Sequence, residues 1–181
     1  NQVMRGAKLV HNIRKLSEIE ERIENIRKLE ILSRIKKRIQ KVKRNFILKR
    51  VKTEINAFSD EIYIKANGLI SDVIENLLIN AITYNNNDVV EIMIKVSEVQ
   101  EQETRYVKIE IIDNGIGIED VRKEKIFTRT EIEAESLSGL GLGLSLVRKI
   151  IDAYGGKVWV EDRVKGEPSK GSNFILIIPA F

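Results

Sequence analysis

An alternating apolar run that ends in one carboxylate and two glycines constrains this chain more than any other feature. The run covers residues 107–112, and the stretch Asp113-Asn114-Gly115-Ile116-Gly117 follows it directly. Alternation of this kind predicts a strand with one buried face, and the glycines mark where the strand ends. Because glycine lets the backbone approach a ligand closely, the stretch predicts a site for a flat, polar ligand.

A second glycine-rich stretch, Gly139-Leu140-Gly141-Leu142-Gly143-Leu144, precedes a predicted helix over residues 142–154. The exposed amides at a helix start and the helix dipole both favour a phosphate group there. The spacing matches neither the dinucleotide motif G-x-G-x-x-G nor a Walker loop ending in Lys-Ser/Thr. The stretch therefore predicts a phosphate site outside the two common nucleotide-binding folds.

Three polar side chains of a predicted helix over residues 69–84 complete this candidate site. Asn76 and Asn80 lie four residues apart, so their amides point the same way. The amide oxygen of Asn80 suits a magnesium ion that bridges ATP phosphates, and Tyr84 offers a flat face to a base. An ionised Asp113 only accepts hydrogen bonds, which favours the exocyclic amine of adenine over the O6 atom of guanine. These elements together predict an ATP site.

The remaining periodicity predicts an α+β domain preceded by a helical arm. Apolar residues spaced three or four apart form stripes over residues 9–26 and 32–46, with a change of phase near residue 30 that suggests a hinge. We therefore divide the chain into a helical arm, residues 1–46, and a domain, residues 47–181. Further strands are predicted over residues 47–55, 61–65, 89–99, 157–161 and 173–178, and a short helix over 119–127.

Two of the connections carry specific expectations. Residues 56–60 read as a turn between the first two strands of the domain, and residues 98–105 as the link of an antiparallel hairpin. Residues 128–138 are polar with little periodicity, which predicts a mobile loop.

Composition bounds the class of protein. The chain has 181 residues, 43% apolar and 32% charged, with no cysteine and one histidine. This balance is typical of a globular domain, and it argues against a disulfide framework and a thiolate or histidine metal centre. No apolar run reaches the roughly 18 residues of a membrane span, so we expect no membrane contact by this stretch. The lack of cysteine permits a cytoplasmic location, and the parent protein can be either soluble or membrane anchored. Because the chain begins at Asn1 without methionine, we expect a piece of a longer protein.

The charge is unevenly distributed. Residues 1–50 carry 16 Lys or Arg against 5 Asp or Glu, whereas the remainder carries 15 against 22. Between Arg34 and Arg50 there are nine basic residues and no acidic one, which would suit phosphate contacts on a nucleic acid. Charge alone is unspecific, so a solvated helix face is the favoured interpretation and nucleic-acid binding the lesser alternative.

Five motifs, in order, resemble the N, G1, F, G2 and G3 boxes of sensor histidine kinases. They are Asn76 to Ala81, Asp113 to Gly117, Ile126-Phe127, Gly139 to Leu144, and Gly171 to Phe174. The resemblance covers about residues 47–181 and implies the ATP-binding domain of the GHKL superfamily. It implies a two-layer α/β sandwich with a mixed sheet, the Bergerat fold, with ATP and Mg²⁺ bound on the helical side.

The resemblance also implies roles for individual residues. Asn80 is similar to the magnesium ligand, Asp113 to the residue that receives the adenine amino group, and residues 128–138 to a flexible lid. The full set of residues that the resemblance places at ATP is Asn76, Asn80, Tyr84, Asp113, Gly115, Gly117, Phe127, Gly139, Gly141, Gly143, Leu144 and Ser172.

Two departures from the family pattern matter for chemistry. Thr83 stands where many members have a phosphate-binding lysine, so another cation must serve, and Arg129 is a candidate. Asn76 stands where the ATP-hydrolysing members have a glutamate that activates water. Glu75 is adjacent, but one residue turns it about 100° around the helix. The pattern therefore favours transfer of the γ-phosphoryl group to a protein over hydrolysis, and an ATPase or a non-phosphorylating ATP switch are the alternatives.

The single histidine, His11, does not have the surroundings of a phosphoacceptor. In this family an acid commonly follows the acceptor, whereas Asn12 follows His11 here. Residues 8–20 instead resemble the second helix of the dimerisation and phosphoacceptor hairpin. The resemblance implies an acceptor histidine outside the given residues, a homodimer in the intact protein, and the receiver domain of a response regulator as partner.

Overall fold

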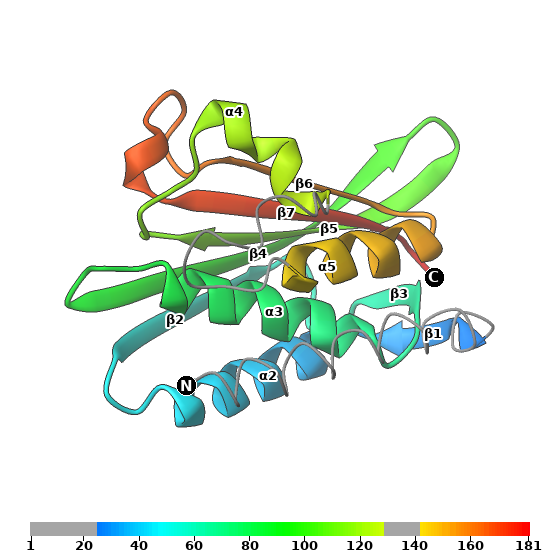
Figure 1. Cartoon of the computed structure of the whole chain (residues 1–181). Helices are drawn as coiled ribbons and strands as arrows, with labels where there is room; N and C mark the ends of the chain where they lie inside the picture. The colour runs from blue at the N-terminus through cyan, green and yellow to red at the C-terminus, as the bar shows by residue number, and fades with distance from the viewer. Residues whose placement is uncertain (1–24, 129–141) are drawn as a thin grey trace.

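The computed structural model describes residues 25–128 and 142–181, in which a five-stranded sheet carries helices on one face (Figure 1). The strand order is β2-β4-β5-β7-β6, and β1 pairs with β3 in a separate two-stranded sheet. The strands are β1 (Arg27–Glu30), β2 (Arg50–Ala57), β3 (Tyr63–Ala66), β4 (Val89–Glu101), β5 (Thr104–Asp113), β6 (Lys157–Asp162) and β7 (Ser172–Pro179). The helices are α2 (Leu32–Asn45), α3 (Ile70–Thr83), α4 (Asp120–Lys123) and α5 (Leu142–Ala153), with short 3₁₀ turns at Lys125–Phe127 and Pro168–Lys170.

The sheet is mixed. β2 runs parallel to β4, and every other neighbouring pair in the five-stranded sheet is antiparallel. Helices α3 and α5 lie against one face, and α2 packs beside α3 (Figure 1). This arrangement confirms the predicted two-layer α/β sandwich with a mixed sheet.

The core follows from the two periodicities of the sequence. In β4, the alternate residues Val90, Ile92, Ile94 and Val96 are buried, while Glu91 and Lys95 on the other face are exposed. Helix α3 buries a wider surface because it lies between the sheet, α2 and α5. Its buried residues are Ile70, Ser71, Val73, Ile74, Leu77, Leu78, Ala81 and Ile82.

The hairpin of β4 and β5 is confirmed, but its connection is much shorter than expected. The strands pair as far as Glu101 and Thr104, so residues 102 and 103 form the whole turn. Gln102 adopts a positive φ of 53°, which two-residue hairpin turns require. The polar side chains of residues 98–101 and 104–105 therefore lie on projecting strand ends, where polarity alone cannot distinguish a strand from a loop.

The two strands on either side of the expected turn, β2 and β3, do not pair with each other. β2 pairs with β4, whereas β3 pairs with β1, so the two strands belong to different sheets. Alternation shows that a segment is a strand but carries no information about which strand it joins.

The hydrophobic core begins upstream of residue 47. The predicted hinge near residue 30 is the end of β1, and the carboxylate of Glu30 accepts hydrogen bonds from the backbone N–H groups of Leu32 (2.7 Å) and Ser33 (2.8 Å) at the start of α2. α2 then buries Leu32, Ile35, Ile39 and Val42 in the same core as α3. Within the described residues, α2 thus packs into the same core as the helices that follow residue 46. Residues 1–24 lie outside the described residues.

The start of α3 is tied to the end of α5. The Oδ1 atom of buried Asn67 accepts hydrogen bonds from the backbone N–H of Leu69 (2.9 Å) and from the hydroxyl of Tyr154 (2.7 Å). Gly155, with a φ of +70°, follows α5 and ends it in the manner of a C-cap glycine. No helix among the described residues is long and apolar enough to cross a bilayer.

Candidate nucleotide site

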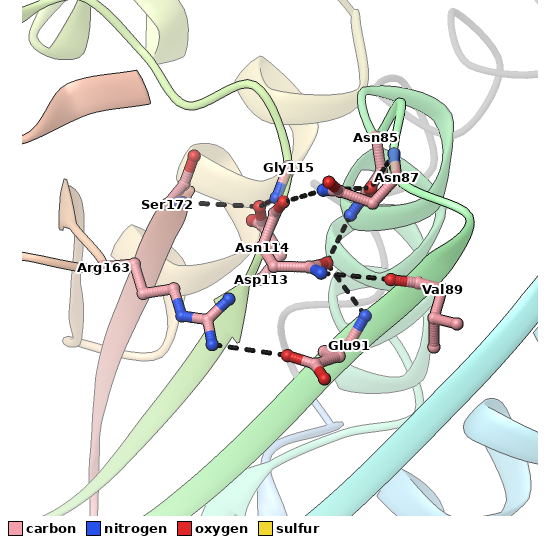
Figure 2. Close-up of polar contacts among 9 residues, drawn as sticks. All are labelled: Asn85, Asn87, Val89, Glu91, Asp113, Asn114, Gly115, Arg163 and Ser172. Carbon is pink, nitrogen blue, oxygen red and sulfur yellow. Dashed lines mark hydrogen bonds and ion pairs between the residues drawn. The ribbon is translucent and has the colours of Figure 1, made fainter. Parts of the chain in front are cut away.

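Asp113 ends β5 with its side chain buried and held in one orientation. The residue is 4% exposed, and its Oδ1 atom accepts hydrogen bonds from the backbone N–H groups of Gly115 (2.7 Å) and Ser172 (3.3 Å) (Figure 2). Residues 25–128 and 142–181 supply no hydrogen-bond donor to the other oxygen, Oδ2. The carboxylate therefore presents one fixed acceptor to a ligand.

The burial of Asp113 also changes its acidity. Loss of water around the carboxylate raises the pKa of Asp113 to about 6, against the opposing effects of the Gly115 and Ser172 hydrogen bonds and the nearby charge of Arg163. Above pH 6 the group is mainly ionised and accepts hydrogen bonds. Below pH 6 it is mainly protonated and presents a donor as well.

The two glycines of the Asp113 loop are required by close backbone contacts. A Cβ atom on Gly115 would lie 2.5 Å from the carbonyl oxygen of Tyr84. Gly117 has a φ of +70°, and a Cβ atom there would lie 1.5 Å from the carbonyl oxygen of Pro168. The backbone N–H of Ile116 also donates to the carbonyl oxygen of Tyr84 (3.0 Å). The loop is thus bonded to the C-terminal end of α3.

A network of asparagines fixes the outer side of the same loop (Figure 2). The side chain of Asn114 donates to the carbonyl oxygen of Val89 (3.0 Å) and accepts from the backbone N–H of Glu91 (2.9 Å). It also accepts from the amide of buried Asn85 (2.7 Å), which in turn accepts from the backbone N–H of Asn87 (3.0 Å). The sequence pattern did not predict this role for Asn85 and Asn87. The only signal was the run of asparagines itself.

On α3, the predicted site residues share a partly exposed face. Asn76 and Asn80 are half-buried and Tyr84 is 44% exposed. The amide of Asn76 donates to the carbonyl oxygen of Asp72 (3.0 Å), and a Cβ atom on Gly143 would lie 3.2 Å from Asn76 Oδ1. The first turn of α5 therefore lies against Asn76, which brings Gly143 to the helix that carries Asn80.

Glu75 faces away from this surface, as its position on the helix predicted. Its carboxylate forms ion pairs with Arg38 (2.7 Å) and Lys41 (2.8 Å) of α2. Burial alone would raise the pKa of Glu75, but the hydrogen bonds and charges of Lys41 and Arg38 outweigh it and hold that pKa below its ordinary value. Glu75 is thus an ion-pair partner between α2 and α3.

The remaining predicted residues divide into packing positions and positions outside the described residues. Phe127 is 5% exposed and meets the ring of Phe174 edge to face, with centroids 6.2 Å apart. Leu144 is partly buried against the core, and buried Ser172 contacts Asp113 through its backbone. The predicted residues His11, Arg129, Gly139 and Gly141 lie outside the described residues.

A hollow of about 400 Å³ opens beside the Asp113 loop. It takes in Gly115 and Ile116, but Asn76, Asn80 and Gly143 do not line it, so it is distinct from the face of α3 described above. Its full lining is Asn86, Asn87, Asn114, Gly115, Ile116, Arg163, Ser169 and Lys170.

Comparison with known proteins gives matches to one family. Residues 66–181 match the family described as histidine kinase-, DNA gyrase B-, and HSP90-like ATPase. The adaptive-response sensory kinase SasA of Synechocystis sp. is 40% identical over 129 residues, which are 70% of this chain and 30% of that kinase. The autoinducer 2 sensor kinase/phosphatase LuxQ of Vibrio vulnificus is 31% identical over 115 residues, 61% of this chain and 13% of LuxQ. The chain thus spans less than a third of the length of these relatives.

Solved structures agree with the sequence comparison. The nucleotide-free catalytic domain of histidine kinase ThkA superposes with a TM-score of 0.72 at 26% identity, covering 86% of this chain and 95% of that domain. ThkA in complex with the response regulator protein TrrA superposes with a TM-score of 0.69 at 24% identity, covering 97% of this chain and 49% of that chain.

Proposed function

Since the chain belongs to the histidine kinase-, DNA gyrase B-, and HSP90-like ATPase family, we propose that it is the catalytic module of a sensor histidine kinase. The module binds Mg-ATP and transfers its γ-phosphoryl group to a histidine on a dimerisation hairpin. The 40% identity to a sensory kinase favours this member of the family over its ATPase branches.

The adenine end of the proposed site is the Asp113 loop, and the carboxylate of Asp113 is the observation that carries the proposal. Its Oδ1 atom is bonded to two backbone N–H groups, so Oδ2 accepts from a ligand in one fixed direction. The exocyclic amine of adenine is a donor of the required kind, whereas O6 of guanine would face the carboxylate with like polarity. Tyr84 and Ile116, both partly exposed, border this loop and offer apolar surface to the base.

The phosphate end of the proposed site lies between α3 and the first turn of α5. Asn80 is half-buried, and its side chain makes no hydrogen bond to the described residues, so its amide oxygen is free to bind a cation. No group of three or more His, Asp or Glu in residues 25–128 and 142–181 is placed to hold a metal. One amide oxygen fits Mg²⁺, because this ion prefers few protein ligands and completes its shell with water and substrate phosphates. When bound, the ion neutralises phosphate charge.

Two features favour phosphoryl transfer over hydrolysis. Asn76, which cannot act as a base, occupies the position of α3 that faces the start of α5. The adjacent carboxylate, Glu75, points about 100° away around the helix, where Arg38 and Lys41 of α2 hold it in ion pairs. The carboxylate next to Asn76 in the sequence is thus not placed to activate water, and the residues contribute by positioning and by charge neutralisation.

The acceptor histidine and the partners are supplied by other segments or molecules in this proposal. His11 is not the acceptor, and residues 8–20 belong to the hairpin through which two copies pair. The ThkA structure contains a response regulator, which supports a receiver domain as the downstream partner of this chain. Such a partner implies action in the cytoplasm.

The experiment that tests the proposal is phosphoryl transfer from labelled ATP. The chain is mixed with an intact dimerisation hairpin from a related kinase, and acid-labile phosphohistidine on the hairpin is measured. Label on the hairpin that Asp113→Asn abolishes is expected. If the chain binds ATP but the hairpin acquires no label, the non-phosphorylating switch is favoured. If the chain releases inorganic phosphate at the same rate with and without the hairpin, an ATPase is favoured.

A further inference from the structure

The turn between α2 and β2 exposes two large apolar side chains. Ile47 is 81% exposed and Leu48 is 97% exposed, more than any other large apolar residue among the described parts of the chain. Val121 on α4 follows at 74%. Exposed apolar residues are ordinary when scattered singly, but two adjacent ones at the tip of a turn point to a contact.

Hydrogen bonds hold this turn in place. The backbone N–H of Lys49 donates to the carbonyl oxygen of Phe46 (2.9 Å), which closes the turn and makes Ile47 and Leu48 its two central residues. The Lys49 ammonium donates to the carbonyl oxygens of Ile82 (3.0 Å) and Asn85 (2.7 Å) at the end of α3. Phe46 itself packs partly buried against the core. The two apolar side chains are therefore held outward by fixed backbone.

Basic residues surround the turn. Of the nine between Arg34 and Arg50, the earlier Arg34, Arg38 and Lys41 are engaged by side chains of α3. Lys43, Arg44 and Arg50 flank the turn, and no ion pair joins them to any residue that the structure describes. Asp88 precedes Val89, the partner of Arg50 in the β2–β4 register, and offsets part of this charge.

We propose that this turn binds an anionic lipid surface. Ile47 and Leu48 enter the headgroup region of the bilayer, and Lys43, Arg44 and Arg50 contact lipid phosphates. A basic surface with a few projecting apolar residues is the chemistry of peripheral membrane contact, which requires no membrane-spanning segment. Our expectation of no membrane contact rested on the lack of such a segment and did not consider this mode.

The shape of the turn favours a membrane over a protein partner. A stable protein interface buries about 800 Å² on each partner around an apolar core of many residues. The turn offers a convex tip of two side chains, which suits insertion between lipid headgroups. The proposal does not depend on phosphoryl transfer, since none of its residues belongs to the nucleotide site.

Co-sedimentation with lipid vesicles tests the proposal on the whole 181-residue chain. Vesicles of phosphatidylcholine with about 30% phosphatidylserine are compared with pure phosphatidylcholine, since anionic lipid attracts basic residues near the surface. We expect binding to the anionic vesicles alone, and a loss of roughly tenfold or more when Ile47→Ser and Leu48→Ser are combined. Arg44→Gln with Arg50→Gln is expected to lower binding as strongly and to reduce its dependence on salt.

Matched control variants distinguish vesicle binding by this turn from nonspecific binding by other exposed residues. Val121→Ser removes another exposed apolar side chain and Lys165→Gln another exposed charge, and each is expected to change vesicle binding by less than about twofold. The Ile47 and Leu48 variant must keep its melting temperature and its ATP affinity. No binding of the parent, equal binding to neutral vesicles, or unchanged binding of the double serine variant would overturn the proposal. Loss of self-association without any vesicle binding would also overturn it and assign the turn to a second copy.

Discussion

The two ends of the nucleotide site are built in different ways. At the adenine end, Asp113 and Asn114 are held by hydrogen bonds to backbone and side chains from three other segments. At the phosphate end, Asn80 makes no side-chain hydrogen bond to the described residues, and Asn76 bonds only within its own helix. Polar groups that are already fixed lose little entropy on binding, whereas unattached groups become ordered by the ligand.

This difference suggests that the two ends have different roles in binding and in phosphoryl transfer. In the proposed function, we expect the adenine end to recognise the base with preformed geometry, so substitutions there should change ATP affinity or the stability of the free protein. We expect the phosphate end to become ordered with the nucleotide and its metal ion, so substitutions there should change phosphoryl transfer.

Asp113→Asn is expected to reduce ATP affinity by at least ~100-fold, about 2.7 kcal/mol. Asn keeps an oxygen for the N–H groups of Gly115 and Ser172, but its NH₂ group then faces the adenine amine, donor against donor. Isothermal titration calorimetry measures the loss. The fold should be retained, and unchanged affinity would show that Asp113 is not at the base.

The same variant should not be less stable at pH 8. The pKa of Asp113, raised to about 6, exceeds the ordinary value, so stability from this group falls as pH rises through about 4 to 6 and stays low above that window. Replacing the buried carboxylate with an amide removes this loss of stability. A lower melting temperature of Asp113→Asn at pH 8 would contradict this account.

Asn114→Ala is expected to lower the free energy of unfolding by about 2–3 kcal/mol, because three hydrogen bonds of its side chain are lost. Urea denaturation measures this change. Asn86→Ala, an exposed neighbour, serves as the control and should change stability by less than about 0.5 kcal/mol. Equal effects of the two variants would mean that the adenine end is not held by the asparagine network.

Asn80→Ala should reduce phosphoryl transfer by at least ~10-fold and change metal-free ADP binding by less than about twofold. The lost group is a metal ligand in this account, so its contribution disappears without the metal. Thr83→Ala, exposed one turn along α3, is the matched control. If ADP affinity without magnesium falls as far as transfer, Asn80 acts on the nucleotide rather than on the ion.

ATP affinity should decline about tenfold between pH 7.5 and pH 5, because protonation of Asp113 removes the acceptor that the adenine amine needs. The phosphates of ATP also titrate in this range. The pH dependence of ATP affinity is therefore measured for Asp113→Asn as well, and it gives the part of the decline that is due to titration of the ligand. Parallel pH profiles of the parent and the variant would show that Asp113 keeps its charge throughout.

Sequence periodicity predicted those helices and strands whose structure is determined by residues close together in the chain. The alternation of β4 and β5 and the helical period of α3 predicted these elements within a few residues, because one buried face determines each of them. The partner of β2 and the strand at residues 27–30 were not predicted, because pairing depends on distant segments. The Asp113 stretch was readable because its glycines meet backbone atoms that no side chain could tolerate.

The sequence alone did not predict the polar network around the site. Asn85 and Asn114 look like loop residues in the sequence, and only their proximity across the ends of α3, β4 and β5 gives them a shared role. Helical geometry predicted that Glu75 points away from Asn76. It did not predict the ion pairs of Glu75 with Arg38 and Lys41, because α2 lies in the segment that we assigned to a separate arm.

The parallel pairing of β2 with β4 has a consequence for the order of folding. The β4–β5 hairpin closes through a two-residue turn, whereas Arg50 pairs with Val89 across an intervening segment that contains β3 and α3. Local contacts form early and distant ones late, so β2 is expected to join after the transition state. Interactions absent from the transition state act on the unfolding rate. Substitutions in β2 should therefore accelerate unfolding and leave refolding of the hairpin nearly unchanged.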